Sequence, residues 1–385
     1  MSICFFTSVH YPFDFRIFHK ECKSLAETGY AVTLVALHNR DETVEGVRIL
    51  GLRRPGSRMV RLTVTGCGAL WRAWKEHADV YHFHDPELIW AAVLLRLAGK
   101  KVVRDVREDL PRQILDKHYL PKWSRRIVAI IAELCEIISA KALSGIVAAT
   151  PLIANRFEKH NRRTVLVRNF PDIAEVTESA TREWGNRENW VIYLGSISEA
   201  RGIRHLIRAM ELMPAELNVR LRLAGEFSPS RLQYSIGQME GWRTVDYLGR
   251  LERSQIFPLL LQGRVGVLTL EDTPHIRFSW PVKLFEYMLA GLPVVASDIP
   301  LWRRIIEEAE CGLLVDPMNP KAIADAITYL LENPSQSAAM GHRGREAVKR
   351  SYNWNGERQR LLSLYADLAG APKACRQVPV TITDP

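Results

Sequence analysis

A carboxylate and an ammonium group lie one turn apart in the segment SWPVKLFEYMLAGLPVVASDIP, residues 279–300. Pro281 suits the first turn of a helix, so Lys283 and Glu286 would both fall near the start of a helix over 282–290. The start of a helix is electropositive and accepts an anion, while a carboxylate one turn further in can accept hydrogen bonds from hydroxyls. A diphosphate joined to a ribose carries both kinds of group. The simpler alternative is an i,i+3 ion pair between the two side chains, which would contribute about 0.2–0.5 kcal/mol.

A second candidate is Arg201, in the stretch YLGSISEARGIRHLIRAM, residues 193–210. The pattern predicts a strand, then Gly195, a polar loop, and a helix that starts near Arg201. A glycine directly after a strand allows a ligand to approach the backbone closely, and the forked donors of an arginine can hold a phosphate. A solvated loop arginine is the alternative.

Two histidines and an aspartate, His82, His84 and Asp85, end the apolar stretch ADVYHFHD. In a strand, residues 82 and 84 point to the same face. We expect one histidine to pack inside, and the more terminal His84 is the better candidate for a functional site. A metal bound by the histidine pair is the alternative, and it lacks a third ligand at a suitable spacing.

Short apolar runs alternate with amphipathic stretches of helical length along most of the chain. In the first half, strands are predicted in SICFFTSV, YAVTLVAL, ADVYHFHD, KKVVRDV, GIVAAT and TVLVRN, with helices between them. After a polar interruption, the alternation resumes at WVIYLGSI and continues to the helix over 320–332. Nearly continuous apolar strands in this order predict an α/β fold with parallel sheets that are covered on both faces.

The sequence therefore predicts two doubly wound, Rossmann-like domains. The first spans residues 1–171, the polar segment 172–188 is a linker, and the second domain spans 189–350. A final helix over 351–370 would pack back on the first domain. Ligands of open parallel sheets bind at the carboxyl ends of the strands, so two such domains facing each other would hold a ligand in the cleft between them.

The composition is that of an ordinary globular protein, with 385 residues of which 47% are hydrophobic and 25% charged. Residues 1–15 lack the basic start and the apolar core of a signal peptide. The most apolar helical run, 127–143, includes Glu133, Glu136 and Lys141, and it is too short and too charged to span a bilayer. The six cysteines show no paired spacing, which is typical of reduced thiols in a cytoplasmic protein.

Positive charge is concentrated in the first half of the chain. Residues 1–171 contain 27 Lys and Arg against 17 Asp and Glu, a net charge of +10, whereas the remainder has a net charge of −1. No nucleic-acid-binding motif accompanies this charge, which favours an anionic membrane surface over nucleic acid, with plain solubility as the alternative. Trp123, Arg125 and Arg126, beside apolar residues in LPKWSRRIVAII, would suit an interfacial helix, although an ordinary sheet-covering helix explains them equally well.

Taken together, these motifs resemble a family 4 retaining glycosyltransferase with the GT-B fold, of the kind found in bacterial surface polysaccharide synthesis. The resemblance runs through nearly the whole chain and is most specific in VYHFHD, NFP, YLGSISEARGI, RLRLAGEF, and KLFEYMLAGLPVVASDIPLWRRII followed by CGLLVDP. It implies that the second domain binds a nucleotide sugar. It further implies that Glu286 holds the ribose hydroxyls, that Arg201 holds the diphosphate, and that His84 contacts the transferred sugar.

Other residues are candidates for contact with substrate because they lie in or beside these motifs. They are Asp14, Arg16, Asp85, Gly195, Ser196, Gly202, Gly225, His275, Ser279, Lys283 and Leu284.

The chain departs from the family pattern at three places. Position 278 is phenylalanine where the family commonly has a second glutamate for the donor sugar, so Thr273, His275 or Ser279 would have to recognise that sugar. A common arginine is replaced by Ser196, so diphosphate binding would rest more heavily on Arg201 and on amides at a helix start. The stretch SVHYPFDFR replaces a glycine-rich loop, which makes its aspartate and arginine candidates for acceptor or phosphate contact.

The resemblance implies that a hexosyl group moves from a UDP- or GDP-sugar to a glycan or lipid-linked acceptor with retention of configuration. Substitution on the front face would let the leaving diphosphate take the acceptor's proton while the enzyme stabilises its developing charge. No metal and no cofactor are expected, in agreement with the lack of an Asp-x-Asp motif. The expected location is cytoplasmic, with possible peripheral attachment to the inner face of the cell membrane, and the expected pathway is exopolysaccharide, capsule or O-antigen synthesis.

Two readings from other classes stay open. The same architecture serves non-hydrolysing sugar-nucleotide epimerases, which bind a similar donor without transferring its sugar to an acceptor. A non-catalytic nucleotide-sugar-binding partner of another transferase is also compatible with Phe278 and Ser196.

Overall fold

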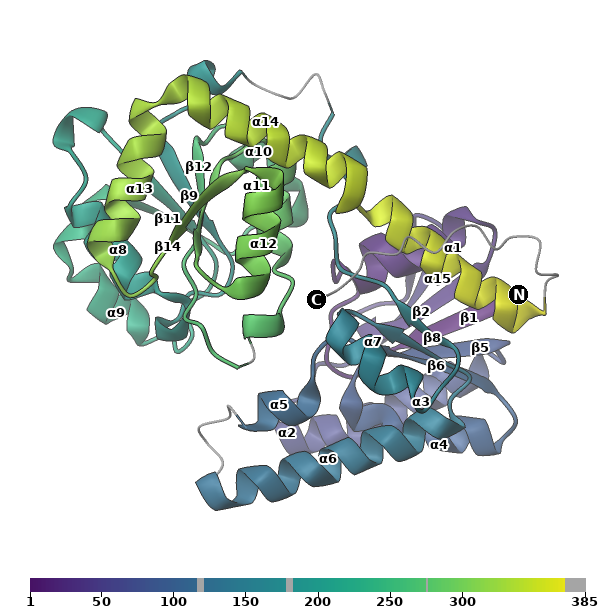
Figure 1. The fold of residues 1–385 in the computed structure, drawn as a ribbon. Helices are drawn as coiled ribbons and strands as arrows, with labels where there is room; N and C mark the ends of the chain where they lie inside the picture. The colour runs from purple at the N-terminus through teal and green to yellow at the C-terminus, as the bar shows by residue number, and fades with distance from the viewer. Residues whose placement is uncertain (116–120, 178–182, 275, 371–385) are drawn as a thin grey trace. The chain divides into compact units, whose positions relative to one another are not determined.

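The computed structural model describes residues 1–115, 121–177, 183–274 and 276–370, and it divides the chain into two compact units (Figure 1). Unit 1 contains Met1–Asn169 and the segment from Asn355 onward, and unit 2 contains Phe170–Trp354. Each unit is built on a predominantly parallel sheet flanked by helices. The predicted α/β fold class with two Rossmann-like halves is therefore confirmed.

The sheet of unit 1 has eight strands in the order β3-β4-β2-β1-β5-β6-β7-β8, and only the β3–β4 pair is antiparallel. These strands are β1 Ser2–Phe6, β2 Ala31–Leu37, β3 Glu42–Val44, β4 Val47–Leu52, β5 Val80–Phe83, β6 Lys101–Val106, β7 Gly145–Ala148 and β8 Thr164–Leu166. The central strands β1 and β5 are almost wholly buried, which explains why their sequences are apolar apart from Ser2 and His82.

Helices follow most of the strands of unit 1. They are α1 Lys23–Glu27, α2 Arg58–Val60, α3 Gly66–Lys75, α4 Ile89–Leu97, α5 Leu110–Leu115, α6 Lys122–Ala142, α7 Pro151–Glu158 and α15 Trp354–Ala369. Wider helical turns over Ile17–Cys22 and Arg61–Thr65 lead into α1 and α3. Among the described residues, none of these helices, and none in unit 2, combines the length and the hydropathy that crossing a bilayer requires.

The last helix, α15, packs on unit 1 although it is far away in the sequence. The Arg168 backbone N–H donates a 2.9 Å hydrogen bond to the Glu357 carboxylate, and Nε of the same arginine donates one of 3.1 Å. The hydroxyl of Tyr365 lies 2.6 Å from Nδ1 of His82 in β5. These contacts are buried and join α15 directly to the middle of the sheet.

The sheet of unit 2 has six parallel strands in the order β11-β10-β9-β12-β13-β14. The strands are β9 Trp190–Leu194, β10 Arg220–Ala224, β11 Val245–Gly249, β12 Val265–Leu268, β13 Val294–Ser297 and β14 Gly312–Val315. The helices are α8 Ile203–Glu211, α9 Leu232–Gly237, α10 Arg253–Leu260, α11 Val282–Leu289, α12 Pro300–Ala309, α13 Pro320–Glu332 and α14 Pro334–Ser351. The polar segment 172–188, predicted to be a linker, groups with unit 2 in its described residues.

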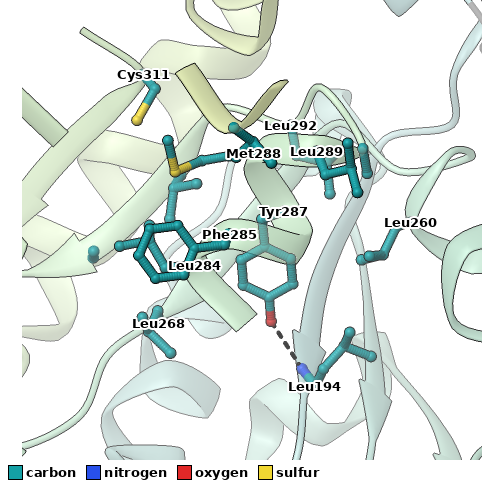
Figure 2. Packing of buried hydrophobic residues seen from close by; sticks show 14 of the residues in the cluster. Leu194, Leu260, Leu268, Leu284, Phe285, Tyr287, Met288, Leu289, Leu292 and Cys311 are labelled. Atoms are coloured by element: carbon teal, nitrogen blue, oxygen red, sulfur yellow. Dashed lines mark hydrogen bonds between the residues drawn. The ribbon is translucent and has the colours of Figure 1, made fainter. Parts of the chain in front are cut away.

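Alternation along β9 divides the core of unit 2 between the two faces of the sheet. Val191 and Tyr193 pack on one side, whereas Ile192 and Leu194 pack on the other, against α11. Figure 2 shows this second cluster, where the Tyr287 hydroxyl of α11 points at the end of β9. It accepts a 2.9 Å hydrogen bond from the backbone N–H of Leu194, so the helix is fastened to the carboxyl end of a central strand.

Candidate functional site

Helix α11 brings the predicted carboxylate to the end of the unit 2 sheet. Its residues from Leu284 to Leu289 are all buried, so the helix is held in place on several sides. Glu286 is only 5% exposed, and its carboxylate contacts the guanidinium of Arg253, the first residue of α10. The i,i+3 alternative is therefore wrong as the explanation of Glu286, because the partner of its carboxylate comes from another helix.

Arg253 also holds a second carboxylate. Its Nε and Nη2 donate hydrogen bonds of 2.6 and 2.8 Å to the two oxygens of Glu175, while Nη1 donates to Oε1 of Glu286. The contact with Glu286 therefore uses one carboxylate oxygen through a charged donor in a fixed position. Arg253 thus orients the carboxylate of Glu286 through one donor, while its bidentate contact is made with Glu175.

Lys283, also on α11, lies beneath the turn that follows β9. A Cβ added at Gly195 would overlap Cε of Lys283, and Gly195 has a φ of +117°, which favours glycine for a second reason. Burial, together with the nearby charge of Arg201, lowers the pKa of Lys283 to about 8, although the carboxylate of Glu286 acts in the opposite direction. The structure thus brings Gly195, Arg201, Lys283 and Glu286 together within unit 2.

Two further glycines shape this edge of the sheet by close packing. A Cβ at Gly202 would overlap the carbonyl oxygen of Thr269. Because glycine has no Cβ, the loop that carries Arg201 can pack directly against the end of β12. A Cβ at Gly225 would overlap the carbonyl oxygen of Gly195, which lets the turns after β9 and β10 lie directly against each other. Both glycines have positive φ values, of +70° and +148°.

A cavity of about 510 Å³ opens at the carboxyl ends of β9, β10 and β11. It is lined by the backbone-rich turns around Gly195 and Gly225 and by side chains that include Phe227, Arg250 and Ile256. Ser196 lies on its wall and is exposed. A cavity of this size with a few polar groups is typical of a site for a small organic ligand, and it lies where ligands of open parallel sheets bind.

The other unit 2 candidates have local partners. The Ser279 hydroxyl donates a 2.8 Å hydrogen bond to the carbonyl of Ile276, and the Thr273 hydroxyl accepts one of 3.3 Å from the N–H of the same isoleucine. The side chain of Leu284 belongs to the core, and Phe278 is 44% exposed. His275 lies outside the described residues.

In unit 1, Arg16 and His84 meet at one buried carboxylate, that of Asp105. Nε and Nη2 of Arg16 donate hydrogen bonds of 2.7 and 2.9 Å to it, and Nδ1 of His84 lies 3.0 Å from it. Burial alone would raise the pKa of Asp105, but the charge of Arg16 and the His84 contact hold it well below its usual range. Because Asp105 stays ionised, it favours the His84 tautomer that carries its proton on Nδ1.

Asp14, Arg16 and Asp85 form further contacts inside unit 1. Arg16 Nη1 donates a 2.8 Å hydrogen bond to the carbonyl of Val167. Asp14 accepts hydrogen bonds from two backbone N–H groups at the start of the helix over Ile17–Glu27, and it pairs with Arg107 at 2.7 Å. Asp85 accepts hydrogen bonds of 2.7 Å from both the Thr7 hydroxyl and the N–H of the next residue. These three residues thus organise the loop after β1.

The structure supplies the third potential metal ligand that the sequence did not reveal. Glu21, His82 and His84 offer donor atoms within 4.8 Å of one another, the one such group among the described residues. The imidazole rings of His82 and His84 are stacked, with their centroids 4.9 Å apart and an angle of 14° between their planes. The two Nε2 lone pairs therefore lie in separate, nearly parallel planes and cannot both be directed at one ion, which does not suit four-coordinate binding.

Four residues of these networks were not predicted as site residues: Glu21, Asp105, Glu175 and Arg253. Asp105, Glu175 and Arg253 meet their partners only through folding over long sequence separations, whereas Glu21 pairs locally with Arg16 at 3.0 Å and reaches His84 only in the folded chain. The start of α10 at Arg253 is visible in the sequence, but its ion pair with a residue 33 positions later is not.

Comparison with known families accounts for both halves of the chain. Residues 16–171 match the glycosyl transferase 4-like domain, and residues 176–347 match the family of glycosyl transferases group 1. A phosphatidyl-myo-inositol mannosyltransferase of Mycobacterium leprae is 29% identical over 185 residues, which is 46% of this chain and 46% of its own. The match thus spans about half the length of that relative.

Solved structures share the fold over nearly the whole chain. The sucrose-phosphate synthase from Thermosynechococcus elongatus superposes with a TM-score of 0.76 at 18% identity, covering 97% of this chain and all of that one. Anabaena HepE in complex with UDP-glucose superposes with a TM-score of 0.69 at 15% identity, covering 95% of this chain and all of that one. The first half of the chain thus matches a glycosyl transferase 4-like domain, the second half matches the glycosyl transferases group 1, and the two Rossmann-like units share the GT-B fold of these solved structures.

Proposed function

We propose that this protein transfers a sugar from a nucleoside diphosphate sugar to a glycan or lipid-linked acceptor with retention of configuration. The observation that carries the proposal is the group formed by Gly195, Arg201, Lys283 and Glu286 beside the 510 Å³ cavity of unit 2. It joins two cations, a fixed carboxylate and a space of suitable size. These are the features that a diphosphate, a ribose and a base require.

In this proposal, each part of the donor meets one part of the group. The nucleoside enters the cavity, and the diphosphate lies at Gly195, where the absent side chain leaves the backbone open to a ligand. Arg201 and Lys283 neutralise the phosphate oxygens. The ribose hydroxyls donate hydrogen bonds to the Glu286 carboxylate, whose orientation Arg253 holds.

Transfer on the front face of the sugar needs no protein nucleophile. The bond between the anomeric carbon and the diphosphate oxygen breaks as the acceptor oxygen bonds to that carbon, and the acceptor's proton moves to the leaving diphosphate. Arg201 and Lys283 stabilise the charge that develops on this leaving group, which is the largest contribution a fixed site can make to such a reaction. Neither a metal nor a cofactor takes part in the proposed chemistry.

The relatives support the choice of substrate class. One is named as a phosphatidyl-myo-inositol mannosyltransferase, and a structure with the same fold was solved with UDP-glucose. We extend this to a UDP- or GDP-hexose as donor and to an acceptor used in exopolysaccharide, capsule or O-antigen synthesis. The net charge of +10 on residues 1–171 agrees with an anionic acceptor, such as a lipid-linked phosphate.

A thermal-shift screen of nucleotide sugars tests donor binding, because a ligand at 100 times its Kd adds about 2.7 kcal/mol of stability. Glu286→Gln should abolish the shift while the fold survives, since Arg253 keeps both hydrogen bonds to Glu175. Glu307→Gln, at an exposed position on α12, is the matched control and should keep the full shift. A wild-type protein that responds to no UDP- or GDP-sugar would contradict the proposal.

Product analysis then separates the proposed reaction from its alternatives. Transfer from a radiolabelled donor to a lipid-linked acceptor, with the anomeric configuration read by NMR, supports a retaining transferase. Conversion of a free nucleotide sugar without any acceptor would instead identify an epimerase. Binding without either reaction would identify a non-catalytic partner.

A further inference from the structure

Helix α6 carries its apolar residues on the outside of unit 1. Trp123 is 76% exposed, Ile138 is 68% exposed, and Ile127, Ile131 and Leu134 between them are each more than half exposed. Their spacing of four, four, three and four residues places all five on one face of the helix. A helix that only covered a sheet would turn this face inward.

The inner face of α6 carries small side chains and one buried carboxylate. Glu136 is fully buried there, and it pairs with Arg104 of β6 at 2.5 Å and with Arg156 of α7 at 2.7 Å. Buried ions fasten the helix to the unit, and large aliphatic side chains face solvent. Burial of the outer residues therefore requires a partner outside unit 1. The ordinary sheet-covering role considered from the sequence does not account for these positions.

The neighbouring helices α3 and α4 also expose large apolar side chains. Helix α4 packs against α6 (Figure 1), and its Trp90, Leu94 and Leu97 are exposed at spacings of four and three residues. Trp71 and Trp74 are exposed on α3, which packs against α4. We call the exposed apolar residues of α3, α4 and α6 the apolar face.

Basic residues accompany the apolar face. The ammonium group of Lys75 lies 3.7 Å from the ring centre of Trp71, and Arg126 is exposed between Trp123 and Ile127. A cavity of about 660 Å³ adjoins α6 on the side of α5 and α7, and the four basic residues of its lining, which include Arg126 and Lys159, outnumber the acidic Asp109 and Glu133. Aliphatic and Trp side chains flanked by Arg and Lys are typical of a helix that lies in the interface of an anionic bilayer.

Charge decides between a bilayer and a second copy of this chain as the occupant. A symmetric dimer through the apolar face would bring together two halves that each carry a net charge of +10. An anionic membrane surface attracts the same charge, at about 1 kcal/mol for each basic residue near it. None of the described helices is suited to span the membrane, so the contact would be interfacial.

We propose that α3, α4 and α6 of unit 1 dock the protein on an anionic lipid bilayer, with the outer residues of α6 inserted into the interface. This inference goes beyond the proposed transfer reaction and does not depend on it. The donor group lies on unit 2, so nucleotide binding and membrane binding can be lost separately.

Flotation of the full-length protein with vesicles tests the docking. Vesicles of phosphatidylcholine and phosphatidylglycerol should bind the protein at low salt, vesicles of phosphatidylcholine alone should bind it more weakly, and about 0.5 M salt should weaken the anionic contact. The triple variant Ile127→Ser, Ile131→Ser, Leu134→Ser should bind at least about tenfold more weakly. A matched triple variant on unit 2, Leu212→Ser, Tyr234→Ser, Met318→Ser, alters residues that are also each more than half exposed and should bind as the wild type does.

Insertion has its own readout at Cys135, which is exposed beside Leu134 on α6. With Cys67 and Cys375 replaced by serine, an environment-sensitive dye on Cys135 should shift its emission to the blue when anionic vesicles are added. The α6 triple variant should keep the far-UV circular dichroism spectrum and the cooperative thermal unfolding of the wild type, which shows that it is folded. Equal vesicle binding by this variant and the wild type would overturn the proposal. So would a concentration-dependent dimer that the α6 substitutions abolish while vesicles leave it unchanged.

Discussion

The guanidinium of Arg253 contacts the carboxylate of Glu286 and, through two further hydrogen bonds, that of Glu175. One arginine at the start of α10 therefore orients the carboxylate that we assign to the ribose. The side chains of Arg253 and Glu286 are only 18% and 6% exposed, so water can replace little of this contact.

Removal of this arginine is expected to cost both stability and donor binding. Arg253→Ala leaves two poorly solvated carboxylates side by side, and we expect the free energy of unfolding to fall by about 2–3 kcal/mol. Urea denaturation measures this loss. Arg204→Ala, on α8, removes a largely exposed pair with Glu199 and should cost less than about 1 kcal/mol. An Arg253→Ala variant that binds UDP- and GDP-sugars as tightly as the wild type would show that the orientation of Glu286 does not matter.

Lys283 is expected to stabilise a bound diphosphate, although its buried charge lowers the free energy of unfolding of the protein without ligand. Its pKa is lowered from 10.5 to about 8 by burial, so the folded chain holds the charged form at a cost of about 3 kcal/mol below pH 8. Lys283→Met should therefore raise the free energy of unfolding at pH 7 while it weakens donor binding. A loss of stability in this variant would contradict the assignment.

The same lysine gives a pH dependence of known sign. The unfolded chain binds more protons than the folded chain between about pH 8 and 10.5, so the cost of burying Lys283 fades and stability rises over this range relative to Lys283→Met. Donor affinity should fall over the same range, because the free lysine loses its charge. Calorimetry in buffers of different ionisation enthalpy should detect proton uptake on binding near pH 9, and a Lys283→Met protein should lose this uptake.

Gly195 is expected to tolerate no side chain. A Cβ there would displace the flexible end of the Lys283 side chain, and the φ of +117° strains any residue other than glycine, so Gly195→Ala should destabilise unit 2 by about 1–3 kcal/mol and abolish donor binding. Gly237→Ala is the control, since its added Cβ meets no atom within 4 Å and its φ is not positive. Thermal unfolding with and without nucleotide compares the two variants. Normal nucleotide binding by Gly195→Ala would place the diphosphate elsewhere.

His84 should affect transfer and not nucleotide binding. It belongs to unit 1, whereas the proposed nucleotide contacts all belong to unit 2. We expect His84→Asn to lower kcat/KM for sugar transfer at least about tenfold, with Kd for UDP or GDP unchanged. His342→Ala, at an exposed position on α14, should leave both constants unchanged. A parallel loss of nucleotide binding in His84→Asn would indicate a structural role for the imidazole.

The elements that carry the candidate donor site could largely be predicted from local pattern. Pro281 and the apolar residues after it predict α11. The glycine that follows the apolar run of β9 predicts the turn against which Lys283 packs. The β3–β4 hairpin and the helical segment from Arg58 to Lys75 were not predicted, because their alternation is short and their exposed residues include many apolar ones.

The sequence by itself determined the fold class, the two-unit organisation and the positions of Arg201 and Glu286 on a turn and a helix. These depend on periodicity and on glycine and proline, which act over a few residues. Only the tertiary structure decided that Arg253 is the partner of Glu286, that Asp105 joins Arg16 to His84, and that α6 turns its apolar face outward. Such pairings form between segments far apart in the chain, and a helical stripe indicates that a face will be buried without indicating which partner buries it.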